Sequence, residues 1–74
     1  MERYDSREVI RRVMMEEGYG QERLASEAGY KSSSSIANIF ANKRGLLTDN
    51  LVKLLGVMGY DVVVRKGEKE FVLK

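Results

Sequence analysis

The stretch QERLASEAGYKSSSSIANIFA, residues 21–41, decides the fold of this 74-residue chain. It predicts two short helices, at about 21–28 and about 33–41, because apolar residues recur in each segment at helical spacing. Gly29 is expected to end the first helix, since glycine readily adopts the left-handed conformation that follows a helix. Two short helices joined by a glycine-containing turn have the geometry of a helix-turn-helix.

The second of these helices has two chemically different faces. Ile36 and Ile39 are expected to anchor one face to the core. The other face carries only small or polar, uncharged side chains, namely Ser33, Ser34, Ala37, Asn38 and Ala41. A helix face that must enter the major groove of DNA, which is about 12 Å wide, has this character.

A further helix is predicted on the N-terminal side of this pair. It should begin near Asp5 or Ser6, because Asp5 followed by Glu8 fits a capping box. Gly18 is the expected end of this helix. Its apolar stripe consists of Val9, Ile10, Val13 and Met14.

A fourth helix is predicted at about 49–58, with Thr48 as its N-cap. Its apolar stripe consists of Leu51, Leu54, Leu55 and Met58. Gly56 interrupts the helix and costs about 1 kcal/mol relative to alanine. Two interpretations of this glycine are open: an exposed position of no special role, or a site of close helix packing.

From Tyr60 onward the pattern is that of a β-hairpin at about 60–73, with two apolar runs around a polar segment that contains Gly67. Because side chains alternate across a strand, the run at 62–64 is apolar on both faces. The hairpin can simply pack on the helices, or it can offer an edge to a second copy, since an exposed apolar edge is otherwise prone to aggregation. We expect a homodimer with an interface formed by Val62, Val63, Val64, Phe71 and Leu73.

The composition excludes several classes of function. The chain has 13 Lys and Arg against 11 Asp and Glu, a net charge of +2, and contains no Cys and no His. Disulfide frameworks, thiolate catalysis, Ser-His triads and metal sites built on Cys or His are therefore excluded. No apolar run approaches the roughly 20 residues of a membrane-spanning helix, and the first residues lack the pattern of a signal peptide. We expect one cytoplasmic domain, residues 1–74, with no enzymatic activity, cofactor, metal or small-molecule ligand.

At these positions the chain resembles the phage Cro/repressor-type helix-turn-helix proteins, the lambda-repressor-like or xenobiotic-response-element (XRE) family. The resemblance covers about residues 9–59, and the residues that carry it are Gln21, Glu22, Arg23, Leu24, Ala25, Gly29, Ile36, Ile39, Asn42, Lys43, Arg44, Leu51, Val52, Lys53 and Leu54. The turn between Gly29 and Ile36 is one residue longer than the commonest form, and Phe40 stands where an acidic residue is frequent. The hairpin that begins near Tyr60 replaces the usual fifth helix, which is more similar to Cro than to longer repressors.

The resemblance implies a mainly α fold, a four-helix lambda-repressor-like domain with a C-terminal β-hairpin. It also implies a dimeric repressor or autorepressor of a phage or mobile-element operator, bound to palindromic double-stranded DNA. By position, the residues implied to read base edges are Ser33, Ser34, Ala37 and Asn38. Those implied to contact phosphate are Gln21, Lys43 and Arg44. Lys31 is a further phosphate candidate, because no acidic residue occurs between Glu27 and Asp49.

The alternative function is a protein-interaction module on the same scaffold, such as an antitoxin or an inhibitor of a bacterial defence protein. The small polar face at residues 33–41 favours DNA, because protein-binding surfaces more often present aromatic anchors. The apolar second strand, with Phe71 and Leu73, keeps the alternative open.

Overall fold

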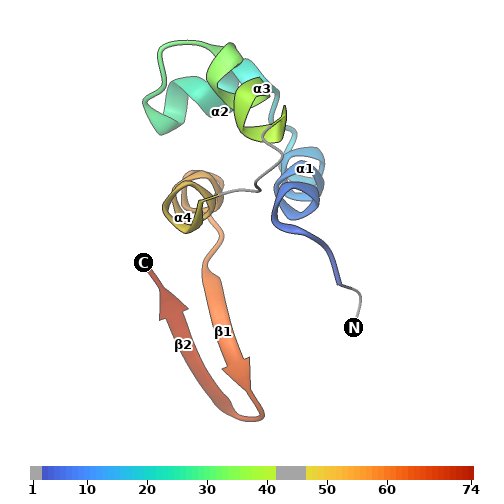
Figure 1. The fold of residues 1–74 in the computed structure, drawn as a ribbon, viewed down its shortest axis with the longest axis vertical. Coiled ribbons are helices and arrows are strands. Elements are labelled where there is room, and N and C mark those ends of the chain that lie inside the picture. The colour runs from blue at the N-terminus through green and yellow to red at the C-terminus, as the bar shows by residue number, and fades with distance from the viewer. Residues whose placement is uncertain (1–2, 42–46) are drawn as a thin grey trace.

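A computed structural model describes residues 3–41 and 47–74. Within these ranges the chain is mainly helical, as predicted, and forms four α-helices followed by a two-stranded antiparallel hairpin (Figure 1). The elements are α1 (Ser6–Glu17), α2 (Gln21–Ala28), α3 (Ser33–Ala41), α4 (Thr48–Val57), β1 (Val62–Lys66) and β2 (Lys69–Leu73). Helices α2 and α3 lie at one end of the long axis of the molecule, and the hairpin lies at the other (Figure 1).

Helix α1 begins and ends where the sequence predicts. The Asp5 carboxylate accepts a hydrogen bond of 2.9 Å from the Glu8 backbone N–H, and this bond is the main cause that lowers the pKa of Asp5. It satisfies one of the backbone donors that every helix leaves free at its N-terminus. Gly18 ends the helix in the left-handed region with φ +69°, which confirms the predicted glycine stop.

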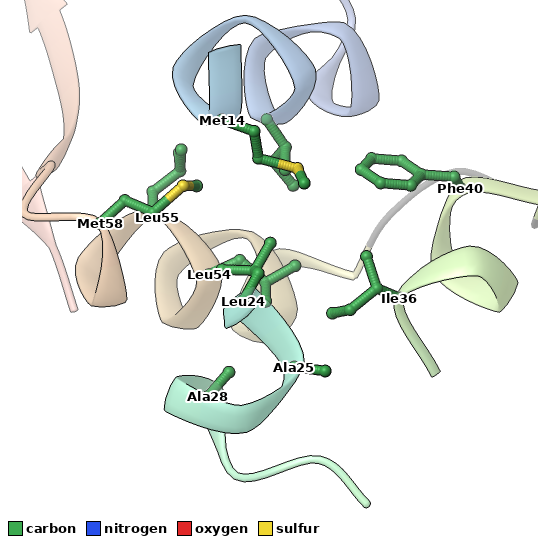
Figure 2. Close-up of a cluster of buried hydrophobic side chains, with 10 residues drawn as sticks. Met14, Leu24, Ala25, Ala28, Ile36, Phe40, Leu54, Leu55 and Met58 are labelled. Carbon is green, nitrogen blue, oxygen red and sulfur yellow. The ribbon is translucent and has the colours of Figure 1, made fainter. Parts of the chain in front are cut away.

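The core lies where the four helices meet (Figure 2). Four of its large side chains are fully buried, one from each helix: Ile10, Leu24, Ile36 and Leu54. Burial of an aliphatic side chain of this size contributes about 1.5–3 kcal/mol to stability. Because the contributors come from all four helices, the helical part of the chain folds around one shared centre.

Helix α3 is anchored by Phe40 as well as by Ile36. Phe40 is buried, whereas Ile39, which was expected to be an anchor, is only half-buried at the edge of the core. The Arg11 guanidinium lies 4.8 Å from the centroid of the Phe40 ring, and Arg7 Nη1 donates to the Phe40 carbonyl at 3.2 Å. Two arginines of α1 therefore hold the C-terminal end of α3.

Helix α4 begins one residue earlier than predicted. Leu47 is the N-cap and Thr48 is already the first helical residue, so the prediction of Thr48 as N-cap is wrong. Leu47 has no polar side chain, and the cap forms without a side-chain hydrogen bond. The helix ends at Val57, with Met58 as the C-cap.

Gly56 in α4 is exposed, and a Cβ atom added to it would have no neighbouring atom within 4 Å. The interpretation of close helix packing is therefore wrong, and the exposed position is confirmed. Replacing Gly56 with alanine should raise the free energy of unfolding by about 1 kcal/mol, because alanine loses less conformational freedom in a helix. Urea denaturation measures this change. Gly59→Ala is the matched control and should destabilise the protein, because Gly59 has φ +87°. A destabilised Gly56→Ala protein would contradict the expectation.

The hairpin pairs its strands in the register Val62↔Leu73, Val63↔Val72, Val64↔Phe71, Arg65↔Glu70 and Lys66↔Lys69. Gly67 has φ +59°, and a glycine at the first position of a two-residue loop is typical of a type II′ hairpin turn. Val62 packs against the helical core, but the apolar side chains that follow it along both strands are exposed. The interpretation that the hairpin packs an apolar face on the helices therefore holds only at Val62.

Candidate nucleic-acid interface

The solvent-facing side of α3 is a stripe of small and polar side chains. We call it the α3 stripe, and its exposed members are Ser34, Ala37, Asn38 and Ala41. They are spaced i, i+3, i+4 and i+7, so they lie on one face of the helix. Ser33 is half-buried in the first turn, at the edge of the stripe. The structure thus brings Ser34, Ala37 and Asn38 onto one exposed surface.

The turn between α2 and α3 fixes the direction in which the stripe faces. Gly29 ends α2 with φ +84°, and its N–H donates to the Ser26 carbonyl at 3.2 Å. The N–H of Tyr30 reaches back to the Ala25 carbonyl at 2.9 Å. Because Ala25 and Ala28 are buried and small, α2 can approach α3 closely. This local geometry agrees with the predicted helix-turn-helix boundaries.

Tyr30 joins this turn to α4. Its hydroxyl donates to Asn50 Oδ1 at 3.2 Å, and Lys53 Nζ lies 4.4 Å from the centroid of its ring. Tyr30 is also partly buried and packs against the core. The connection ties the turn that precedes α3 to α4.

The serine run lies at the start of α3. Ser32 precedes the helix, and its carbonyl accepts a hydrogen bond of 3.2 Å from the Ser35 N–H. The hydroxyl of Ser32 lies 2.6 Å from that of Ser34, so these two side chains form one hydrogen-bonded pair. Sequence reasoning missed this pair, which lies at the N-terminal end of the stripe.

Two of the predicted phosphate contacts are exposed residues that precede α3 in the chain. Gln21 is exposed at the first position of α2, and Gly20 caps that helix without a side-chain hydrogen bond. The amide N–H groups at this helix N-terminus suit an anion. Lys31 is exposed in the turn and, with Ser32 and Ser33, lines a hollow of about 400 Å³. Lys43 and Arg44 lie outside the described residues.

The carboxylate of Glu27, exposed on α2, forms an ion pair with Arg23. Glu27 accepts hydrogen bonds from Arg23 Nε at 2.8 Å and from the Tyr19 hydroxyl at 2.9 Å, and these bonds lower the pKa of Glu27, the one from Arg23 most. The Arg23 guanidinium also lies 3.9 Å from the centroid of the Tyr19 ring. Glu27 therefore remains ionised and paired, and its charge near the turn is balanced by Arg23.

The predicted dimer residues lie on the hairpin, at the far end of the molecule from the α3 stripe (Figure 1). By strand alternation, the residues that share one face are Val62, Val64, Phe71 and Leu73. Val63 lies on the opposite face, where its cross-strand partner is Val72.

Neither a metal-binding cluster nor a membrane-spanning helix occurs in the described residues. Among residues 3–41 and 47–74, no group of three or more Asp, Glu, His or Cys side chains is placed to hold a metal ion. Over the same ranges, no helix has the length and apolar character needed to cross a membrane. No family model, curated protein or solved structure matches the chain.

Proposed function

We propose that this protein is a sequence-specific DNA-binding transcriptional regulator that reads base edges with α3 in the major groove. The observation that carries this proposal is the α3 stripe, whose exposed side chains are small or polar and include no charge. An α-helix with its side chains is about 10–12 Å wide, close to the width of the major groove. Small side chains on the leading face allow the helix to enter deeply.

Asn38 is the residue best suited to select a base. The asparagine amide can form a bidentate pair with N6 and N7 of adenine, and serine hydroxyls such as that of Ser34 can donate to or accept from several base edges. Ala37 lies between them on the same exposed face and supplies room or an apolar contact to a thymine methyl group. Ser33 is proposed to reach a base from the edge of the stripe.

The proposed phosphate contacts come from residues on both sides of α3 in the sequence. Gln21 and the N–H groups at the start of α2 would hold one phosphate, and Lys31 would neutralise another. Lys43 and Arg44 are assigned to the backbone by the family resemblance. Such contacts fix the orientation of α3 on the duplex, but they carry no sequence information themselves.

The proposed fold is that of a lambda-repressor-like domain similar to Cro. The order of the described elements supports it: α2 and α3 form the helix-turn-helix, α1 and α4 close the core, and the hairpin stands in the place of a fifth helix. The proposed role is that of a dimeric repressor or autorepressor of a phage or mobile-element operator. Repression would follow from occupation of a promoter by a palindrome-bound homodimer.

An exposed aromatic side chain favours a second candidate function. Phe71 is 69% exposed, and aromatic residues are frequent anchors of protein interfaces. A protein-interaction module of the antitoxin or inhibitor type would use the hairpin and not the α3 stripe. The interaction module predicts sensitivity to mutation in the hairpin alone, whereas the DNA-binding function also predicts sensitivity in the α3 stripe.

Replacing Asn38 with alanine tests the proposed reading of DNA. The variant should lose about 1–3 kcal/mol of discrimination at one base position in each half-site, because the bidentate pair is removed. Competition binding with single-base operator variants measures this loss. Lys31→Ala is the control, and it should weaken binding to all sequences alike. Unchanged base preference in Asn38→Ala would show that α3 does not read DNA through this residue.

A further inference from the structure

We propose that a hollow beside the start of the hairpin binds a small organic cation with an apolar body. This hollow, which we call the Asp61 hollow after one of its lining residues, has a volume of about 400 Å³. Its size lies within the range of about 300–1,000 Å³ that is usual for small-molecule sites. None of the described residues that line it belongs to the α3 stripe, so the site lies outside the surface proposed to read DNA.

The apolar part of the Asp61 hollow comes from three elements. Leu55 of α4 is buried in the core. Val9 of α1, Leu51 of α4 and Val62 of β1 are partly buried and pack against that core. Helices α1 and α4 are in contact, and β1 leads away from α4 (Figure 1). Because these residues are far apart in the sequence, sequence reasoning predicted no small-molecule ligand.

Two further apolar side chains line the hollow and remain exposed. Tyr4 is 38% exposed and Val63 is 46% exposed. The Arg12 guanidinium lies 4.2 Å from the centroid of the Tyr4 ring, so the N-terminal segment is attached to α1 at this point. A ligand in the hollow would remove apolar area of Tyr4 and Val63 from water, which favours binding.

The charge of the proposed ligand follows from Asp61. This residue is exposed, and within residues 3–41 and 47–74 its carboxylate forms no hydrogen bond or ion pair. Arg12, the cation that stacks on Tyr4, is already paired with Glu8 at 3.1 Å. A positively charged ligand group would therefore gain an ion pair with Asp61, whereas a carboxylate would be repelled. The apolar lining and this single unpaired charge together select a hydrophobic amine.

A ligand in the Asp61 hollow would contact both the hairpin and the helices. Val62 packs against the helical core, but the rest of β1 is exposed. A ligand that touches Val62 and Val63 on β1 and Leu51 on α4 has to leave before β1 can separate from the helices. Binding should therefore slow the local opening of the hairpin by mass action.

Titration of the full chain with naphthylmethylamine tests the site and the class of ligand. The amine should bind with a Kd of about a millimolar, as expected for about 12 non-hydrogen atoms. It should shift the amide NMR signals of Val9, Leu51 and Val62, and not those of the α3 stripe. The neutral naphthylmethanol should bind about threefold more weakly, and naphthoate more weakly still. Equal affinity for all three compounds, or the largest shifts in the α3 stripe, would overturn the proposal.

Replacing Asp61 with asparagine tests the source of the charge preference. The variant should bind naphthylmethylamine about threefold more weakly and naphthylmethanol with unchanged affinity, because only the ion pair is lost. Glu68→Gln is the matched control, since Glu68 is an exposed acidic residue of the hairpin turn that does not line the hollow. An equal loss in both variants would assign the attraction to net charge and would overturn the proposed contact with Asp61.

Hydrogen exchange measures the expected effect on the hairpin. At an amine concentration ten times the Kd, the slowest-exchanging amides of β1 should exchange about tenfold more slowly, because the ligand has to dissociate before β1 opens. Unchanged exchange at this concentration would contradict a ligand bound between β1 and α4.

The protein concentration distinguishes the ligand from a second copy of the chain as the occupant of the hollow. The Kd of the amine should be the same at low and at high protein concentration. A Kd that rises with protein concentration would show that a second copy covers the Asp61 hollow, and would overturn the proposal. None of these results would affect the proposed reading of DNA by α3, because all are measured without DNA and Asn38→Ala tests that reading separately.

Discussion

Raising the salt concentration from about 50 to about 200 mM should weaken binding of the protein to DNA by about a thousandfold. If the dimer makes about six phosphate contacts, the logarithm of the affinity should fall with the logarithm of the salt concentration with a slope near −5. The six charged contacts are Lys31, Lys43 and Arg44 of each copy, whereas Gln21 is uncharged and adds nothing to the slope. Fluorescence anisotropy of a labelled operator duplex over a salt series measures the slope.

A single-residue control sharpens the salt experiment. Lys31→Ala should make the slope less steep by about one for each copy, because one phosphate contact is lost. Asn38→Ala should leave the slope unchanged, because a base contact releases no counterion. Binding that does not depend on salt, or no binding at low salt, would contradict the proposed function.

Removal of residues 61–74 should abolish tight binding to a palindrome. The truncated chain loses the exposed hairpin that is proposed to join two copies, so it should bind only a half-site, and weakly. Half-sites bound by a dimer of this kind lie about one helical turn of DNA apart. The truncation should also lower stability, because Val62 packs against the helical core.

Binding to a duplex with one half-site and to the full palindrome separates the loss of dimerisation from the loss of stability. Full-length and truncated proteins should have similar affinity for a duplex with one half-site, and only the full-length protein should gain affinity from the second. Circular dichroism at the assay temperature checks that the truncated chain is folded. Equal affinity of both proteins for the full palindrome would contradict dimerisation through the hairpin.

Local signals in the sequence predicted the helices well. Asp5 caps α1 and Gly18 ends it, because capping depends on a few neighbouring residues and on the left-handed conformation that glycine allows. The boundaries of α2 and α3 follow from Gly29 and from the spacing of Leu24 and Ile36 in the same way. These features need no knowledge of distant parts of the chain.

Features that depend on distant contacts were not predicted. The predicted cap of α4 was also wrong, although capping is local: Leu47 takes the place of Thr48 without a side-chain hydrogen bond. Arg7 and Arg11 of α1 hold Phe40 of α3, a contact between residues far apart in the sequence. No sequence pattern places an arginine over a particular ring, because that position depends on how two helices cross.

The exposure of the α3 stripe could be predicted from the sequence, but its side-chain contacts could not. The exposure of Ala37 and Asn38 followed from helical spacing, since Ile36 and Phe40 turn toward the core on the other side. The pairing of Ser32 with Ser34, and the hold of Tyr30 on α4, required the tertiary fold. The separation of the hairpin from the helices likewise depends on the path of the chain after α4.

Selection of bound sequences from a pool of random duplex DNA tests the central claim most directly. The full-length protein should enrich a palindrome whose half-sites are centred about 10 base pairs apart. The Asn38→Ala protein should enrich the same palindrome with one position of each half-site relaxed. Recovery of a pool with no enriched sequence, at a salt concentration at which the protein binds DNA, would contradict sequence-specific recognition by α3.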